Sequence, residues 1–383
     1  MDKKWFLTLI IFIAASCTVF AFAQAPQFVP APDSPVAVGE GSGLVLIADV
    51  NRDGKPDLIT QHLLQRVVSV QLGDGTGRFV PAPASPIKLA YSPGGIKSGE
   101  VNGDSILDLV IVSGERNAVD ILLGDGGGKF HQAPGAPFSV GAATGFNTGL
   151  QLADINEDGK LDIIAVSNQR NSFGTLFGNG RGGFTPGATT SFTIGQGRYA
   201  FAFGDVDGDK HLDAVIANTG SGDEFSPEPG KVVVLGGDGK GTFNKLSQTT
   251  VPLGTRWVAL GDLNGDGRDD LTLNHSGGQL STLLNQGGGK FAAGSSYDLN
   301  TNAFAVNLAD VNQDKRNDLI VATVDSVTVL LNGKNRFAPA PGSPFRAGPG
   351  AYHLAVGDVN RDGKPDIAAS SFEGKLLTVL LGR

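Results

Sequence analysis

The chain has 383 residues, including 56 Gly and 20 Pro, and its formal net charge is −8 at pH 7. So many turn formers, with few long runs of helix formers, exclude a mainly helical fold and favour short strands joined by turns. The single cysteine, Cys17, excludes a fold held together by disulfides.

The first 23 residues are typical of a secretory signal peptide. Two lysines precede an apolar run, and Ala21-Phe22-Ala23 is a small-x-small cleavage site before Gln24. We therefore expect residues 24–383 to be secreted, periplasmic or bound at the cell surface, without a membrane span after cleavage. An uncleaved anchor is the alternative, because the apolar run is nearly long enough to cross a bilayer.

A nine-residue motif then recurs seven times. Its first copy is Asp49-Val-Asn51-Arg-Asp53-Gly-Lys-Pro-Asp57, with oxygen-bearing side chains at the first, third, fifth and ninth positions. Successive copies begin 48 to 57 residues apart, at Glu100, Asp154, Asp205, Asp262, Asp310 and Asp358. Seven repeats of this length are typical of the blades of a β-propeller.

Each motif lies among short apolar segments. One such segment precedes it and two follow it, and a Gly-rich turn then leads through a phenylalanine into a segment rich in Pro and Ala. That last segment suits an outer edge strand, because proline cannot donate to a ladder on both sides. Four strands per repeat predict an all-β, seven-bladed propeller.

The two ends of the chain complete one repeat. The last repeat stops after its third strand, and residues 27–39 (QFVPAPDSPVAVG) match residues 78–90 and 336–348, which supply the fourth strand elsewhere. We expect the N-terminal strand to complete the seventh blade, so that residues 24–383 form one closed propeller. An open solenoid of seven repeats is the alternative.

The motif and the "GDGxGxF" turn that follows the third strand resemble the FG-GAP/VCBS repeats. This family forms seven-bladed propellers in integrin α-chain heads and in many secreted bacterial proteins, and the resemblance covers about residues 27 to 383. The FG-GAP tetrads themselves are degenerate in this chain. The resemblance implies an extracellular binding or adhesion module.

The spacing of the motif also predicts calcium loops. Alternate side chains turn toward one point, and the carbonyl of the seventh residue adds a ligand, giving the hard oxygens that calcium prefers over zinc or copper. We expect up to seven ions. The predicted ligands are Asp49, Asn51, Asp53, Lys55, Asp57; Glu100, Asn102, Asp104, Asp108; Asp154, Asn156, Asp158, Lys160, Asp162; Asp205, Asp207, Asp209, His211, Asp213; Asp262, Asn264, Asp266, Arg268, Asp270; Asp310, Asn312, Asp314, Arg316, Asp318; Asp358, Asn360, Asp362, Lys364 and Asp366.

The loops beginning at Asp49, Asp154, Asp262 and Asp358 are predicted to be the strongest. Their sixth residue is glycine, whereas Ser105, Lys210 or Lys315 at that place costs roughly 1 kcal/mol in a left-handed conformation. A metal-free Asx turn is the alternative for each loop. Of the 38 acidic residues, 22 lie at predicted ligand positions, so the negative net charge of the chain indicates metal sites. We expect calcium to stabilise the fold rather than to act as a signal that changes its conformation.

A ligand site is predicted on the opposite face, on the segments that precede the innermost strands. Aromatic, amide and cationic side chains gather there, and the insertion 219–230 joins them. Such side chains suit a glycan or an extracellular protein, and packing between blades is the alternative. The candidates are Asn147, Arg198, Tyr199, Arg256, Trp257, Phe304, Tyr352 and His353.

Catalysis is not expected. The five histidines are scattered, and neither a Ser-His-Asp order nor zinc-ligand spacing is present, so no catalytic residue is assigned. The family resemblance keeps a calcium-dependent polysaccharide lyase as the alternative, because related lyases use His, Arg or Tyr, here Arg198, Tyr199, Arg256, Tyr352 or His353. We expect a monomer with no nucleic-acid partner.

Overall fold

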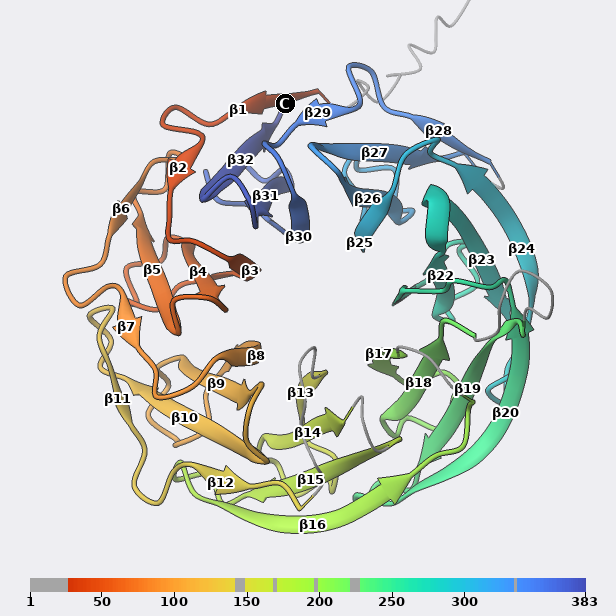
Figure 1. Ribbon diagram of the computed structural model, residues 1–383, viewed down its shortest axis with the longest axis horizontal. Coiled ribbons are helices and arrows are strands. Elements are labelled where there is room, and N and C mark those ends of the chain that lie inside the picture. The colour runs from red at the N-terminus through yellow and green to blue at the C-terminus, as the bar shows by residue number, and fades with distance from the viewer. Residues whose placement is uncertain (1–26, 142–148, 168–170, 196–198, 221–227, 334–335) are drawn as a thin grey trace, which may run out of the picture.

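The computed structural model describes residues 27–141, 149–167, 171–195, 199–220, 228–333 and 336–383. These residues form seven antiparallel sheets around a central axis, and their one helix is the 3-10 turn η1 (Ser276–Gly278), too short to cross a membrane (Figure 1). The predicted all-β, seven-bladed propeller is confirmed. The predicted signal peptide lies outside the described residues.

The strands of each blade run from the axis to the rim in chain order, except in the last blade. The blades are: blade 1, β3 (Ser42–Ala48), β4 (Asp57–His62), β5 (Val67–Gly73), β6 (Phe79–Pro81) and β7 (Ile87–Lys88); blade 2, β8 (Pro93–Gly99), β9 (Asp108–Ser113), β10 (Ala118–Gly124), β11 (Phe130–Gln132) and β12 (Phe138–Ser139); blade 3, β13 (Leu150–Ala153), β14 (Asp162–Ser167), β15 (Ser172–Gly178) and β16 (Phe184–Ser191); blade 4, β17 (Tyr199–Gly204), β18 (Asp213–Asn218), β19 (Gly230–Gly237) and β20 (Phe243–Val251); blade 5, β21 (Trp257–Gly261), β22 (Asp270–Asn274), β23 (Gln279–Asn285) and β24 (Phe291–Asp298); blade 6, β25 (Ala303–Ala309), β26 (Asp318–Thr323), β27 (Ser326–Asn332), β28 (Phe337–Pro339) and β29 (Phe345–Arg346); blade 7, β30 (Ala351–Gly357), β31 (Asp366–Ser371), β32 (Leu376–Gly382), β1 (Phe28–Pro30) and β2 (Val36–Ala37).

The core consists of layers between neighbouring blades. The second strand of every blade is buried along its whole length, because both of its faces are covered. Val110 of blade 2, for example, shares a cluster with Ile163 of blade 3, whereas Ile111 packs with Ile59 of blade 1. This two-sided burial explains why most of these strands are apolar runs rather than alternating ones, although β4 (DLITQH) and β22 (DLTLN) bury polar side chains as well.

The rim differs between blades. In blades 1, 2, 6 and 7 the outer strand is divided into two short strands, whereas in blades 3, 4 and 5 it is continuous. At the break in blade 1, the Ser85 hydroxyl accepts the Val70 N–H at 2.9 Å, and Ser343 and Ser34 do the same for Val329 and Val379. The recurring Ser-Pro pair of the sequence therefore replaces a missing ladder bond of the third strand.

The ring closes between the ends of the described chain, as predicted. Strand β1 pairs antiparallel with β32, with Phe28 opposite Gly382. The Arg383 N–H donates to the Gln27 carbonyl at 2.8 Å. The Phe28 side chain is 6% exposed and packs edge-on against Phe345 of blade 6. The N-terminal strand thus completes the seventh blade and seals its boundary with the sixth.

One core histidine predicts a pH dependence of stability. His275 is 2% exposed, and its ring nitrogens contact the hydroxyls of Thr255 (2.9 Å) and Ser281 (2.6 Å). Burial lowers its pKa from 6.5 to about 4, so the folded state keeps the ring neutral while the unfolded state takes up a proton as the pH falls through 6.5. Stability is therefore lost from pH 6.5 down to about 4, by about 1.4 kcal/mol at a pH of about 5.5.

Urea unfolding of the wild type and of His275→Gln, at a pH of about 7.5 and of about 5.5, measures this contribution. The variant is expected to lose less stability on acidification than the wild type. His131→Gln, which changes an exposed histidine, is the control. Equal losses in all three proteins would contradict the prediction.

Candidate functional site

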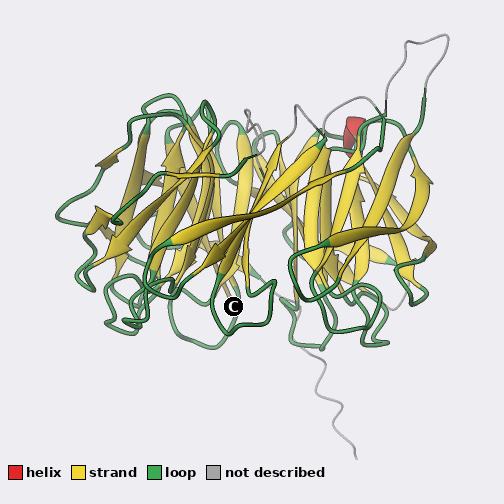
Figure 2. Cartoon of the chain, turned by 90° about the horizontal axis from the view of Figure 1, so that it is seen from below, coloured by secondary structure: helices red, strands yellow, loops and turns green. Residues whose placement is uncertain are grey.

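The seven acidic loops lie on one face of the disc. Each joins the innermost strand of a blade to the second, and the Gly-rich turn after the third strand lies on the same face, because the strands of a blade alternate in direction. Loops cover both faces of the disc (Figure 2). The turns between second and third strands, and the segments that precede the innermost strands, lie on the opposite face. The predicted metal loops and the predicted ligand site are therefore on opposite faces.

Within a loop, alternate side chains turn inward. In the first loop Asp49 Oδ2 accepts the Gly54 N–H at 2.8 Å, and Asn51 Oδ1 accepts the Asp53 N–H at 3.1 Å. The loops at Asp154 and Asp358 repeat both bonds. In the fourth loop the carboxylates of Asp205, Asp207 and Asp209 lie within 4.8 Å of one another. This arrangement of hard oxygens fits a calcium ion and also the alternative Asx turn.

The ninth residue of every loop has a role that the sequence analysis missed. Asp57 is fully buried, and its two oxygens accept the N–H groups of Val50 and of Gly73 in the third strand, both at 2.9 Å. The six equivalent aspartates are equally buried and make the same two bonds at 2.7 to 3.1 Å. Each therefore ties its loop to the third strand of its blade.

The electrostatic cost of these carboxylates is visible in their pKa values. Burial, with the nearby loop carboxylates, raises the pKa of Asp57, Asp318 and Asp366 to about 6, against the lowering effect of their backbone bonds. Some of the charge is balanced inside the loops, because the Arg268 side chain pairs with Asp266 at 2.7 Å and Lys160 pairs with Asp158 at 3.1 Å. A bound divalent cation would balance the remainder.

The backbone confirms the expected strain at the sixth position and adds a second strained position. Ser105, Lys210 and Lys315 have φ of 64°, 76° and 69°. The fourth residue of all seven loops also has a positive φ, from 59° at Arg52 to 92° at Gly208. Glycine stands at that fourth position in three loops, which was the signal in the sequence. The Asp310 loop has no glycine at either position and is thus the most strained.

The candidate ligand residues fall into separate groups. Asn147 and Arg198 lie outside the described residues. Tyr199 packs with Phe192 and Phe201, and its hydroxyl donates to the Gly195 carbonyl. The Arg256 side chain is exposed, and no ring contact involving it is described. The structure therefore does not join all eight residues into one crescent.

Four of the candidates form two ring pairs, at blades 5 to 7. The rings of Phe304 and Tyr352 lie 4.3 Å apart, and those of Trp257 and His353 lie 5.6 Å apart. The Trp257 N–H donates to the Val306 carbonyl, and burial lowers the pKa of His353 to about 4. Trp257 and His353 thus pack between blades, and only part of each side chain lies at the surface.

A further aromatic residue belongs to this group. Phe372, in the turn between β31 and β32, lies 5.6 Å from Tyr352, centroid to centroid. Phe304, Tyr352 and Phe372 are all half-buried and form what we call the aromatic stack. Phe372 lies in a turn between a second and a third strand, whereas the predicted site residues all precede or begin an innermost strand, so the sequence pattern did not include it.

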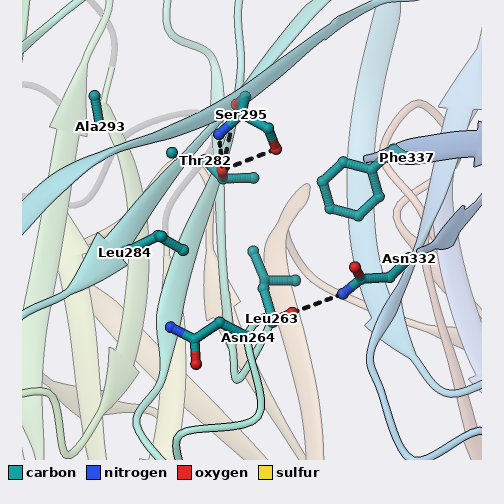
Figure 3. Close-up of a pocket in the computed structure, with 9 residues that line it drawn as sticks. Leu263, Asn264, Thr282, Leu284, Ala293, Ser295, Asn332 and Phe337 are labelled. Atoms are coloured by element: carbon teal, nitrogen blue, oxygen red, sulfur yellow. Dashed lines mark hydrogen bonds between the residues drawn. The ribbon is translucent and has the colours of Figure 1, made fainter. Parts of the chain in front are cut away.

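A pocket of about 320 Å³ lies between blades 5 and 6, next to Asn264 of the fifth loop (Figure 3). Its polar walls are already engaged: Thr282 exchanges hydrogen bonds with Ser295, and the Asn332 amide donates to the Leu263 carbonyl at 2.8 Å. With few free polar groups, the pocket suits a ligand less well than the aromatic stack does.

Seven sheets around an axis, each with the same acidic loop, define a β-propeller built from sequence repeats. The chain belongs to the FG-GAP-like repeat family, which it matches over residues 100–165, 154–216, 218–273, 262–321 and 310–369. The resemblance seen in the sequence is thereby confirmed. No curated protein gives a significant match to the chain.

Solved structures share the fold at low sequence identity. BBS1N in complex with ARL6DN, in crystals soaked with mercury or lead, is 15% or 17% identical with TM-scores of 0.59 and 0.60, covering 92% of this chain and 96% of that one. An Agrocybe aegerita lectin, described for recognition of non-reducing terminal N-acetylglucosamine, is 19% identical with a TM-score of 0.56, covering 89% of this chain and 94% of the lectin. At such identities the likeness concerns the fold alone.

Proposed function

We propose that this protein is a secreted, calcium-stabilised binding and adhesion module that holds an extracellular glycan or protein on the face opposite the acidic loops. The observation that carries the proposal is the aromatic stack of Phe304, Tyr352 and Phe372, half exposed on that face. Exposed aromatic rings on a rigid scaffold supply large contact area at low entropic cost.

Two further observations support a binding role. The turns around the stack are joined by backbone hydrogen bonds, such as Phe372 N–H to the Gly350 carbonyl at 2.8 Å, so the rings are held in place before a ligand arrives. Among proteins of similar fold, one is described in complex with ARL6DN and another as a lectin for N-acetylglucosamine. The lectin recognises a glycan and the other structure is a complex with ARL6DN, so both neighbours are binding proteins.

Calcium belongs to the proposal as a structural ion. The side-chain oxygens at the first, third, fifth and ninth positions of each loop, with the seventh carbonyl, would hold it, and its charge would offset the repulsion among the carboxylates. The loops connect strands rather than helices that could reorient. We therefore expect calcium to raise the stability of the fold, and so to maintain the structure of the binding face.

The test is retention of the mature protein, in calcium, on immobilised polysaccharides and extracellular-matrix proteins, scored also for release of shorter products. Tyr352→Ala and Phe372→Ala should each abolish retention without lowering the melting temperature substantially. Leu64→Ala is the control, because Leu64 is 68% exposed in a turn on the same face of blade 1. Retention that survives both aromatic substitutions would overturn the proposal, and shorter products would establish the lyase instead.

A further inference from the structure

Solvent reaches the axis of the disc between the innermost strands. Leu46, Ala202 and Ala355, each in the innermost strand of its blade, are half-buried, whereas the second strands of the same blades are buried throughout. A central channel is a general feature of β-propellers, and we call this one the axial channel. Its wall consists of the strands nearest the axis in Figure 1, which are β3, β8, β13, β17, β21, β25 and β30.

One cationic side chain belongs to this wall. Within the seven innermost strands as described, Lys97 of β8 is the one lysine or arginine, and no aspartate or glutamate occurs. Lys97 is half-buried and lies opposite Val110, which packs toward blade 3. Because β9 lies behind β8 and blades 1 and 3 flank it, the exposed part of Lys97 faces the axial channel.

The nearest acidic residues do not neutralise Lys97. Glu100 turns into its own loop, where it accepts the N–H groups of Asn102 and Gly103. Asp108 is fully buried and accepts two backbone N–H groups. In the part of the chain that the structure describes, no ion pair involves the Lys97 ammonium, and burial lowers its pKa. An ammonium held in this way without a counter-charge is costly, and an anion would relieve that cost.

The backbone of β8 offers further donors next to this ammonium. The strand pairs only with β9, so alternate N–H groups along its other edge face the channel without a strand partner. Its sequence is PGGIKSG, with a bulge between Pro93 and Gly95, and Gly94 and Gly95 have no side chains that could screen their N–H groups. An ammonium and backbone donors therefore line the same stretch of the wall.

We propose that the axial channel binds a small oxyanion, either a carboxylate or a tetrahedral anion such as sulfate, at Lys97. Hydrogen bonds between an ammonium and an oxyanion are charge-assisted, and they are stronger than neutral ones. The several oxygens of such an ion can accept from Lys97 and from the N–H groups of β8 together, whereas a halide has a single acceptor atom. The site is separate from the aromatic stack, so the inference goes beyond the proposed function and does not depend on it.

The test follows the lysine signals in NMR spectra of a protein of residues 24–383 labelled with ε-¹³C-lysine, in calcium. Lys97→Met keeps the length of the side chain and identifies the Lys97 signal by its loss. Titration with acetate, and separately with sulfate, should shift this signal to saturation, whereas chloride at the same ionic strength should not. Acetate and sulfate distinguish a site for a planar carboxylate from a site for a tetrahedral anion.

Calorimetry supplies a second measurement. At about ten times its dissociation constant, the bound oxyanion should raise the melting temperature of the wild type by about 2 °C more than that of Lys97→Met. Lys88→Met changes an exposed lysine of β7 at the rim and should respond like the wild type. The proposal is overturned if neither oxyanion shifts the Lys97 signal to saturation, if chloride shifts it equally, or if Lys97→Met keeps the full rise in melting temperature.

Discussion

Removing residues 24–38 from a protein that consists of residues 24–383 is expected to lower its melting temperature by about 5 °C or more. The deletion removes β1 and β2, which pair with β32, and exposes the third strand of blade 7 as a bare edge. It also uncovers the clusters that Phe28 and Ala31 close, and burial of one phenylalanine alone stabilises by about 2–3 kcal/mol. Differential scanning calorimetry in calcium would measure the change.

A circular permutant is the matched control. Its chain starts at Glu40 and continues to Arg383. An added Gly-Thr-Gly linker, a copy of residues 75–77 of blade 1, then leads into residues 27–39. Every strand is kept and only the position of the chain break changes, because Gln27 and Arg383 are already hydrogen bonded. The permutant should melt within a few degrees of the wild type. A truncated chain that melts like the permutant would show that closure contributes nothing.

Removal of calcium by a chelator is expected to lower the melting temperature by several degrees or more. Loops that together hold 22 carboxylates, some buried, would lose their counter-charge. The stability that a ligand adds to the native state depends on its concentration, so the melting temperature should rise again as calcium is restored. Calorimetry over a calcium titration measures this, and a melt that chelator leaves unchanged would contradict it.

Two substitutions in the first loop distinguish the effect of lost calcium binding from the effect of lost backbone hydrogen bonds. Asp53 is exposed and belongs to the metal face of the loop, so Asp53→Ala should reduce the calcium response and leave the chelated protein unaffected. Asp57 satisfies two buried N–H groups and is also a proposed calcium ligand, so Asp57→Ala should reduce the calcium response and in addition cost about 2–5 kcal/mol in the chelated protein. Identical effects of the two substitutions would show that this division of roles is wrong.

Much of the fold could be predicted because the sequence pattern of one blade is repeated seven times. The spacing from Asp49 to Asp358 gave the blade number, and the match between residues 27–39 and 78–90 predicted the pairing of β1 with β32. Repetition turns a weak local pattern into a strong one, since each copy faces the same structural demand. The divided rim strands were not predicted, although a Ser-Pro pair accompanies three of the four and an Ala-Pro pair the other.

The sites could be predicted only in part. Asp57 belongs to the metal motif by spacing, and its bond to Gly73 joins residues 16 apart, which no local pattern shows. Trp257 was predicted as a ligand-site residue, with packing between blades as the alternative, and its N–H donates to the Val306 carbonyl of the next blade. Tyr352 was found, whereas its neighbour Phe372 was not, because their contact depends on how two separate turns meet.

The pairing of β1 with β32 also sets how the molecule responds to force. Gln27 and Arg383 lie side by side at the same end of this antiparallel pair, so tension applied through those two residues acts across the hydrogen bonds. Such a load opens the bonds one after another, beginning between Gln27 and Arg383, instead of shearing them together. If the propeller were tethered by both ends, the seventh blade would be the first part to open under load.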